Sequence, residues 1–275
     1  MTEVAKIAAD TKLFDGLTTV ASRAAAAILA VSPSDLARRE KSDHSPVTTA
    51  DLSSEAAIAE GLKQLLPGVP VISEESAAPG TPANREPAYV LVDPLDGTRE
   101  LLAGRDEFTV NIAVMIDGEP QMGIVAAPAR GLIWRGAVGV IAERLRLAPG
   151  ASAATARDRI AIRTRAQSPG HLVALISRSH LDYATEAYLA RFKPAEKIQC
   201  GSSLKFCMLA EGSADIYPRL APTSEWDVAA GQAVLTAAGG IVTAPDGQPL
   251  GYGQRSDFRI SAFIARGDRT LNLMP

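Results

Sequence analysis

The chain has 275 residues, 47% of them hydrophobic, which is enough for one large domain or two fused halves with a substantial core. Its net charge of −3, without a basic tail or a long charge run, argues against a binder of nucleic-acid polymers, although a small anionic substrate remains possible. The two cysteines lack metal or redox spacing, which fits a reduced cytoplasmic protein. No signal peptide or bilayer-spanning apolar run is visible.

The first third of the chain predicts two helices and a short strand. Apolar residues at helical spacing predict a long helix over about residues 4–31. Thr48 with Asp51 three positions later resembles a capping box, which would open a second helix over about residues 47–66. On local grounds, Asp51 could serve only to face the dipole of that helix. A strand over residues 69–72 then runs into the acidic pair that begins with Glu74.

The central stretch, residues 89–98, predicts a buried strand that ends in a polar turn. Its first half is apolar and rich in β-branched residues. We expect the strand to end at Asp93-Pro94, because proline lacks an N–H and restricts the residue before it. Two aspartates, Asp93 and Asp96, would then lie at the carboxyl end of a strand, where open sheets usually bind ligands.

The residue types in this turn favour Mg²⁺ and phosphate. Two close carboxylates repel each other unless a cation or a proton lies between them. Hard oxygen ligands suit Mg²⁺, and Gly97 and Thr98 add backbone N–H groups and a hydroxyl that could meet a phosphate. An ordinary Asp-Gly turn is the alternative interpretation.

The rest of the chain predicts a hairpin at Asp117-Gly118 and then alternating strands and helices. The expected strands are 108–116, 121–127, 132–140, 172–177, 198–201 and 214–220, with two more near 241 and 260–264. The expected helices are 181–192, 203–211 and 226–238. Residues 141–170 are expected to be irregular, and we therefore place a boundary there between an N-terminal half, 1–150, and a C-terminal half, 151–275.

Carboxylates lie where predicted elements begin or end, at four places far apart in the sequence: Asp51, Glu74, Asp93 with Asp96, and Asp227. Periodicity cannot show that they converge, and Asp227 alone could simply cap a helix. Haloacid-dehalogenase-type phosphatases also carry two aspartates after a buried strand. Their second aspartate lies two residues after the first, where this chain has Leu95, which argues against an aspartyl-phosphate mechanism.

Three separate motifs resemble the signatures of the inositol monophosphatase superfamily, in the order that the family shows. They are Ser73-Glu74-Glu75, Asp93-Pro94-Leu95-Asp96-Gly97-Thr98 and Trp226-Asp227-Val228-Ala229-Ala230-Gly231. Further segments resemble its CysQ branch, the 3′(2′),5′-bisphosphate nucleotidases: 45–48, 107–113, 176–180, 201–207, 209–212 and 217–219. The resemblance runs from the first helix to about Gly251.

This resemblance implies an α+β fold, a layered α/β/α/β/α sandwich with a metal site between its halves. It implies that Mg²⁺ is held by Glu74, Asp93, Asp96, Asp227 and the backbone carbonyl of Leu95. It implies that Thr98, with Glu74 and Asp51, orients and deprotonates the attacking water. The residues implied to contact the substrate are Glu74, Asp96, Gly97, Thr98, Ser202, Ser203, Lys205, Arg219 and Asp227.

The implied activity is Mg²⁺-dependent hydrolysis of the 3′-phosphate of adenosine 3′,5′-bisphosphate to AMP and phosphate, linked to sulfate assimilation and sensitive to lithium. An inositol or sugar monophosphatase and a non-catalytic nucleotide-binding protein remain as alternatives. The chain departs from the branch pattern at Arg99-Glu100-Leu101 and at Ser224-Glu225, which bears on substrate preference. His180 is interpreted as a structural or substrate-edge residue rather than a general acid. The resemblance also allows peripheral association with the inner face of the membrane, and it leaves the oligomeric state open.

Overall fold

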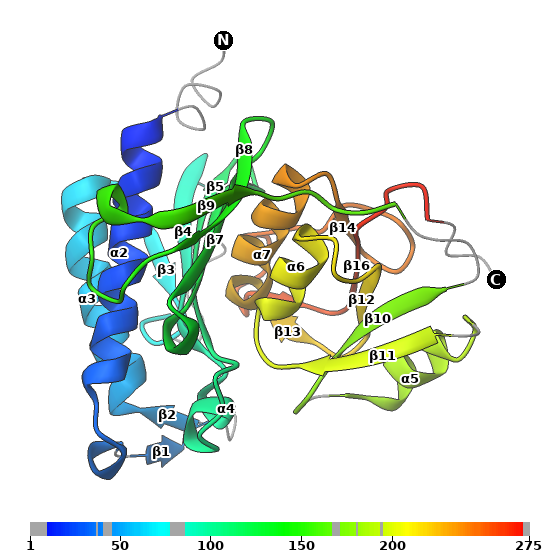
Figure 1. Ribbon diagram of the computed structural model, residues 1–275, viewed down its shortest axis with the longest axis horizontal. Helices are drawn as coiled ribbons and strands as arrows, with labels where there is room; N and C mark the ends of the chain where they lie inside the picture. Colours follow the sequence, from blue (N-terminus) through cyan, green and yellow to red (C-terminus); the bar gives the residue numbers. More distant parts are fainter. Residues whose placement is uncertain are drawn as a thin grey trace.

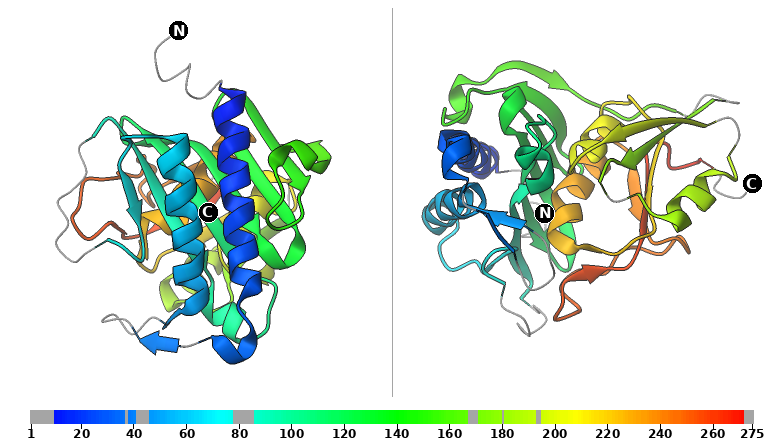
Figure 2. Two further views of the ribbon diagram at one scale, coloured as in Figure 1. Left: turned by 90° about the vertical axis from the view of Figure 1, so that its left-hand side faces the viewer. Right: turned by 90° about the horizontal axis from the view of Figure 1, so that it is seen from below.

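Helices and sheets alternate in five layers in the computed structural model, which describes residues 10–36, 38–40, 46–77, 86–166, 171–179, 181–192 and 195–271. Helices α2 (Thr11–Ala30) and α3 (Thr49–Leu65) pack side by side on one face of a seven-stranded sheet (Figure 1). Helices α6 (Leu204–Ala210) and α7 (Glu225–Ala237) lie between that sheet and a five-stranded sheet. Helix α5 (Tyr183–Leu189) covers the far face of the second sheet (Figure 2). The predicted α/β/α/β/α sandwich is confirmed.

The seven-stranded sheet has the order β3-β4-β5-β6-β7-β8-β9, with β3 parallel to β4 and every other pair antiparallel. Its strands are β3 Val71–Ser73, β4 Ala88–Asp96, β5 Thr109–Ile116, β6 Glu119–Ala127, β7 Leu132–Ala137, β8 Ile141–Arg146 and β9 Arg157–Ala161.

The five-stranded sheet has the order β11-β10-β12-β16-β14. Its strands are β10 Leu172–Ser177, β11 Ala195–Cys200, β12 Ile216–Arg219, β14 Ile241–Thr243 and β16 Phe263–Arg266. The remaining elements are the strand pairs β1 Arg38–Glu40 with β2 Pro46–Thr48 and β13 Thr223–Ser224 with β15 Arg259–Ile260, helix α4 Thr98–Leu102, and 3₁₀ turns Pro33–Asp35, Pro128–Arg130 and Ala153–Thr155.

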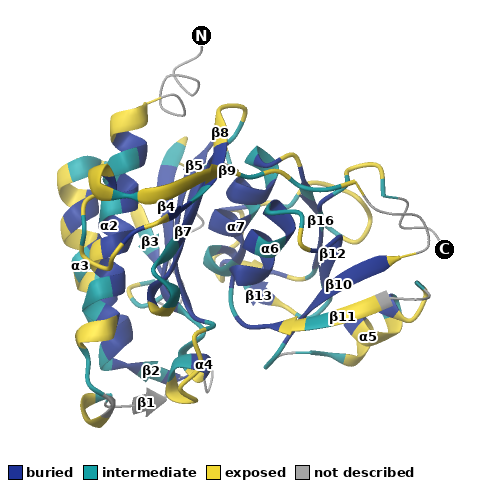
Figure 3. Ribbon diagram, in the orientation of Figure 1, coloured by how far each residue is buried: buried dark blue, intermediate teal, exposed yellow. Residues whose placement is uncertain are grey.

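Strand β4 lies between two hydrophobic cores, as its continuous apolar run predicts. Val90 and Val92 belong to the core beneath α2 and α3, whereas Tyr89 and Leu91 belong to the core shared with α6 and α7. Figure 3 shows that the central strands and α7 are buried, while exposure is concentrated on the outer helices and on β9. The strand that delivers the acidic turn is therefore held firmly on both faces.

The structure corrects the prediction that β4 ends at Asp93-Pro94. The strand continues to Asp96, with a register shift in which Asp93 pairs with Asn111 and Asp96 pairs with Thr109. The three residues advanced along β4 therefore lie opposite only two along β5, which is the pattern of a β-bulge. The extra residue in a bulge does not donate an N–H hydrogen bond to the neighbouring strand, so a proline is tolerated there. In a regular strand, residues three apart point to opposite faces. The bulge allows both aspartates to approach one site.

The prediction that residues 141–170 are irregular is also wrong, because β8 and β9 lie in this segment. Charged residues hide the strand pattern of β8. Glu143 points inward, where its Oε1 accepts hydrogen bonds from buried Arg135, whose Nη1 also donates to Asp15 of α2 at 2.6 Å. Strand β9 is exposed along its length, as a charged edge strand can be. The division at residue 150 stays a prediction, although β9 still belongs to the first sheet.

Helix α2 is long and apolar enough, by length and composition alone, to cross a membrane. More than half of this segment is buried inside the protein, where residues such as Leu17 and Ile28 pack in the core beneath the first sheet. A core helix of a globular domain has the same properties.

Candidate active site

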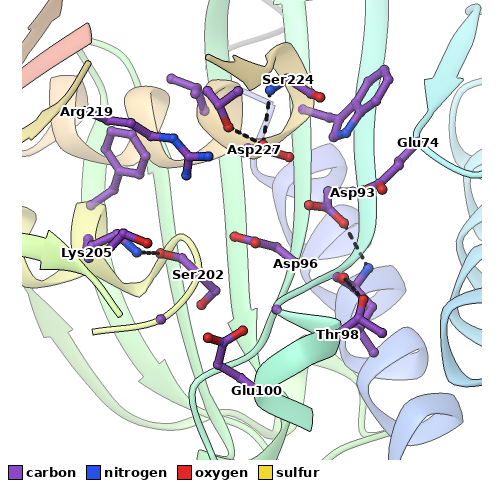
Figure 4. A pocket seen from close by; sticks show the side chains of 18 of the residues that line it. Glu74, Asp93, Asp96, Thr98, Glu100, Ser202, Lys205, Arg219, Ser224 and Asp227 are labelled. Atoms are coloured by element: carbon purple, nitrogen blue, oxygen red, sulfur yellow. Dashed lines mark hydrogen bonds between the residues drawn. The ribbon is translucent and has the colours of Figure 1, made fainter. Parts of the chain in front are cut away.

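Three carboxylates that are far apart in the sequence meet at one edge of the first sheet. Carboxylate oxygens of Glu74, Asp93 and Asp227 all lie within 4.8 Å of one another. Glu74 directly follows β3, and because Ser73 pairs with Val92 in the parallel register, Glu74 lies beside Asp93. Asp227 comes from the first turn of α7, and Figure 4 shows the three side chains converging on one cavity.

The electrostatics of this cluster favour a bound cation. Burial, and then the charges of Glu74, Asp96 and Asp227, raise the pKa of Asp93 well above its usual value. Burial and the charge of Asp227 raise the pKa of Asp96 to about 6, against the lowering effects of Lys205, Ser203 and Arg219. Oxygen-only ligands of this kind suit a hard divalent cation, so the residues fit the metal that the resemblance implies. Leu95, whose carbonyl is a predicted ligand, lines the same cavity.

Thr98 and Asp51 form a hydrogen-bonded pair beside the cluster. Thr98 Oγ1 donates to Asp51 Oδ1 at 3.0 Å, while Asp51 Oδ2 accepts from Thr48 N and Oγ1 at 2.8 and 2.6 Å. The capping box at α3 is therefore present, and it leaves the second oxygen of Asp51 for Thr98. Asp227 likewise belongs both to a capping box, at the start of α7, and to the acidic cluster. Its Oδ2 accepts hydrogen bonds from Ser224 N at 3.1 Å and from the Thr223 hydroxyl, and these bonds fix its position at the start of α7.

Gly97 occupies a backbone conformation that explains its residue type. Its φ is +98°, in the left-handed region, and an added Cβ would lie 3.1 Å from Glu107 O and 3.2 Å from Phe108 Cα. This turn places Thr98 at the beginning of α4 and at the wall of the cavity.

The predicted substrate residues of the C-terminal half occupy different environments. Ser202, Lys205 and Arg219 line the cavity opposite Glu74 and Thr98, with Asp96 between the two groups (Figure 4). Ser203 is instead buried beneath the site, where its Oγ lies 3.0 Å from Asp96 Oδ2 and 2.9 Å from the Asp227 carbonyl oxygen. Ser203 therefore holds the Asp96 carboxylate in place and does not line the cavity.

Lys205 is also more constrained than the sequence predicts. It is 1% exposed, and its Nζ donates to the carbonyl oxygens of Cys200 and Ser202 at 3.0 and 2.6 Å. The ammonium group lies 5.1 Å from the centre of the Tyr217 ring. Two of its three donors thus hold the backbone loop before α6, and its charge lowers the pKa of Asp96.

Sequence reasoning missed a clamp that holds the same loop. Glu107 accepts two hydrogen bonds from Arg178, at 2.7 and 2.8 Å, and one from Gly201 N at 2.8 Å. A Cβ on Gly201 would lie 2.7 Å from Glu107 O, so only glycine fits this close approach. All three residues fall within the segments that resemble the CysQ branch, but spacing alone did not indicate that they touch. His180 and Ser45 lie outside the described residues.

The chain belongs to the inositol monophosphatase family, whose model matches residues 9–266. Members of this family are metal-dependent phosphatases, and the present chain is accordingly a phosphatase. It is 41% identical over 226 residues to the 3′(2′),5′-bisphosphate nucleotidase CysQ of Escherichia coli (strain K12), an alignment that covers 79% of this chain and 84% of the relative. The nucleotidase CysQ of Haemophilus influenzae is 29% identical over 236 residues, 84% of each chain.

Solved structures show the same family relationship. CysQ from Bacteroides thetaiotaomicron, described as a bacterial member of the inositol monophosphatase family, aligns with a TM-score of 0.79 and 32% identity, over 95% of this chain and 99% of that one. An inositol monophosphatase from Anabaena (Nostoc) aligns with a TM-score of 0.69 and 26% identity, over 93% of this chain and 90% of that one.

Replacing Asp93 by asparagine should separate stability from activity. The asparagine side chain would keep the volume and the acceptor for Leu95 N, now bonded at 3.0 Å, but would remove one negative charge from the cluster. In chelator, we expect an unchanged or higher Tm, because self-repulsion falls. Since even outer-shell changes at metal sites cost about 10–100-fold, activity should fall on the order of a hundredfold or more. Asp117→Asn, at an exposed hairpin turn, is the matched control. An active Asp93→Asn variant would contradict the assignment.

The raised pKa of Asp96 predicts an unusual pH dependence for the metal-free protein. Because the folded state binds this proton more tightly than the unfolded chain, the contribution to stability decreases as pH rises from about 3.8 to about 6. In chelator, lowering the pH from about 7.5 to about 4.5 should therefore raise Tm more in the wild type than in Asp96→Asn, as differential scanning calorimetry would measure. Equal pH profiles for the two proteins would rule out this charge effect.

Lys205→Met should weaken the fold as well as the reaction. The change would leave the buried carbonyl groups of Cys200 and Ser202 without their donor, so we expect a loss of about 1–3 kcal/mol in the free energy of unfolding. Exposed Lys197→Met provides the control. Because the loop and Asp96 serve any substrate, kcat/KM should decrease by a similar factor for nucleotide and inositol phosphates. A stable variant with a loss confined to the nucleotide would instead support a direct phosphate contact.

Proposed function

We propose that this phosphatase removes the 3′-phosphate of adenosine 3′,5′-bisphosphate, giving AMP and phosphate. The observation that carries the proposal is the composition of the cavity. An acidic cluster lies on one side, and the guanidinium of Arg219 lies on the other, with Asp96 between them (Figure 4). A substrate with a second phosphate needs positive charge away from the reacting centre. The nucleotidase names of the relatives, at up to 41% identity, support the same substrate class.

The residues suggest a direct attack of water on phosphorus. Glu74, Asp93, Asp96, Asp227 and the Leu95 carbonyl would hold Mg²⁺, which neutralises phosphate charge and makes a nearby water more acidic. Thr98 Oγ1 donates its proton to Asp51 and therefore keeps a lone pair for a hydrogen bond from that water. Asp51 would accept the proton through Thr98, with Glu74 orienting the water from the other side.

On the leaving side, the pocket would hold the nucleoside by the loop before α6. Ser202 lines the cavity with a φ of +46°, and Lys205 fixes its carbonyl, so the loop is preorganised for a ligand. Arg219 lines the same wall, and its Nε has no hydrogen-bond partner among the described residues. We assign this guanidinium to the second phosphate, because arginine offers a planar fork that matches phosphate oxygens.

The choice of Mg²⁺ among divalent cations belongs to this proposal, as do a cytoplasmic location and a role in clearing a by-product of sulfate assimilation. Peripheral attachment at the inner face of the membrane remains a further hypothesis.

Phosphate release from a panel of substrates tests the proposal. The purified protein should hydrolyse adenosine 3′,5′-bisphosphate with the highest kcat/KM, compared with inositol 1-phosphate and fructose 1,6-bisphosphate, in buffers containing Mg²⁺. A preference for inositol 1-phosphate would favour an inositol monophosphatase instead. Binding of the nucleotide without phosphate release from any of the three would point to a non-catalytic protein. Arg219→Met should raise KM for the bisphosphate more than for inositol 1-phosphate, since only the former carries the second phosphate.

A further inference from the structure

One carboxylate in the cavity takes no part in the acidic cluster. Glu100 comes from α4, two residues after Thr98, and its side chain is 4% exposed. Figure 4 shows it below Asp96, with its carboxylate directed toward Ser202 across the cavity that both line. A carboxylate this deeply buried requires hydrogen-bond donors, because leaving its oxygens unpaired costs free energy.

The residues that the structure describes supply only part of that requirement. Ser179 Oγ donates to Glu100 Oε1, and this is the one hydrogen bond to the Glu100 carboxylate within the described part of the chain. Arg178 is a neighbouring cation, but its guanidinium bonds to Glu107 and to the Gln199 carbonyl, at 2.7–3.0 Å. Among the described residues, no salt bridge reaches Glu100. The second oxygen, Oε2, thus has no hydrogen-bond partner in that part of the chain, and Glu100 lines the cavity, where a ligand can reach it.

The charge of Glu100 limits what that ligand group can be. A carboxylate repels phosphate oxygens, so it must face a neutral O–H or N–H donor of the substrate. Glu100 and Thr98 both come from the short helix α4 and line the same cavity, which places Glu100 near the phosphate that is attacked. The substrate donor nearest to that phosphate is the sugar hydroxyl on the adjacent carbon, which for a 3′-phosphate is the ribose 2′-hydroxyl.

We propose that Glu100 accepts a hydrogen bond from the hydroxyl adjacent to the scissile phosphate and so selects ribose over deoxyribose, an inference that rests on the proposed nucleotidase function. Gly201 supports this geometry, because a Cβ there would lie 2.9 Å from Glu100 Cγ and push the carboxylate away. In the same way, Glu100 would disfavour a second phosphate on the adjacent carbon.

A comparison of two substrates and three variants tests the proposal. Wild-type protein should hydrolyse adenosine 3′,5′-bisphosphate with a kcat/KM on the order of tenfold to a hundredfold above that for 2′-deoxyadenosine 3′,5′-bisphosphate, as expected for a hydrogen bond to a charged group. Glu100→Gln should reduce this ratio of kcat/KM values. Glu100→Met, which has no acceptor oxygen, should bring the ratio close to the value set by the intrinsic reactivities of the two substrates alone. Ser179→Ala removes the neighbouring contact but keeps the carboxylate, so it should leave the ratio unchanged.

The ratio separates recognition from structural support, because a variant that only disturbs the fold lowers both rates by the same factor. Equal losses on the two substrates in both Glu100 variants would overturn the proposal, as would a wild-type protein that does not discriminate. If the protein released no phosphate from the nucleotide, the proposed function would fail separately. The same comparison would then be made with inositol 1-phosphate and its 2-deoxy analogue, where an unchanged ratio in the Glu100 variants would also overturn the proposal.

Discussion

Mutual repulsion among closely spaced carboxylates, of which Asp93 is buried, is the constraint on which this structure depends. Glu74, Asp93 and Asp227 approach one another within 4.8 Å, and Asp96 lies close enough to raise the pKa of Asp93. Such a cluster persists only if the surrounding fold is rigid and a counter-charge is supplied. The two cores on either face of β4 provide the rigidity, and Lys205 provides one buried positive charge. The divalent cation inferred here would supply the remaining positive charge.

The acidic cluster also explains why both parts of the chain are needed for one site. Helix α7 packs on the first sheet and on β14 of the second sheet, and it carries Asp227 in its N-terminal turn. Glu107, before β5, bonds both to Arg178, after β10, and to Gly201 of the loop before α6. The cavity wall opposite the acidic cluster is therefore positioned by contacts that cross between the two sheets.

Much of the fold could be predicted because its signals are local. The periodicity of α2, the capping box of α3 and the apolar run of β4 all correspond to elements in the structure. Strand β8 was missed because Glu143 is charged yet points inward to a partner on the neighbouring strand, Arg135. The continuation of β4 past Pro94 was missed because a bulge depends on the register of β5, which no single segment encodes.

By itself, the sequence determined which residue types are available and where most of the elements lie: carboxylates after strands, glycine at the turn, and a motif order that resembles one superfamily. Only the tertiary structure decided which of these residues meet. Asp51 and Thr98 are 47 positions apart but share a hydrogen bond, Lys205 turned out to hold its own loop, and Glu100 proved to line the cavity. The physical reason is that these contacts depend on sheet order, strand register and the packing of α7, and these are set jointly by segments distant in the chain.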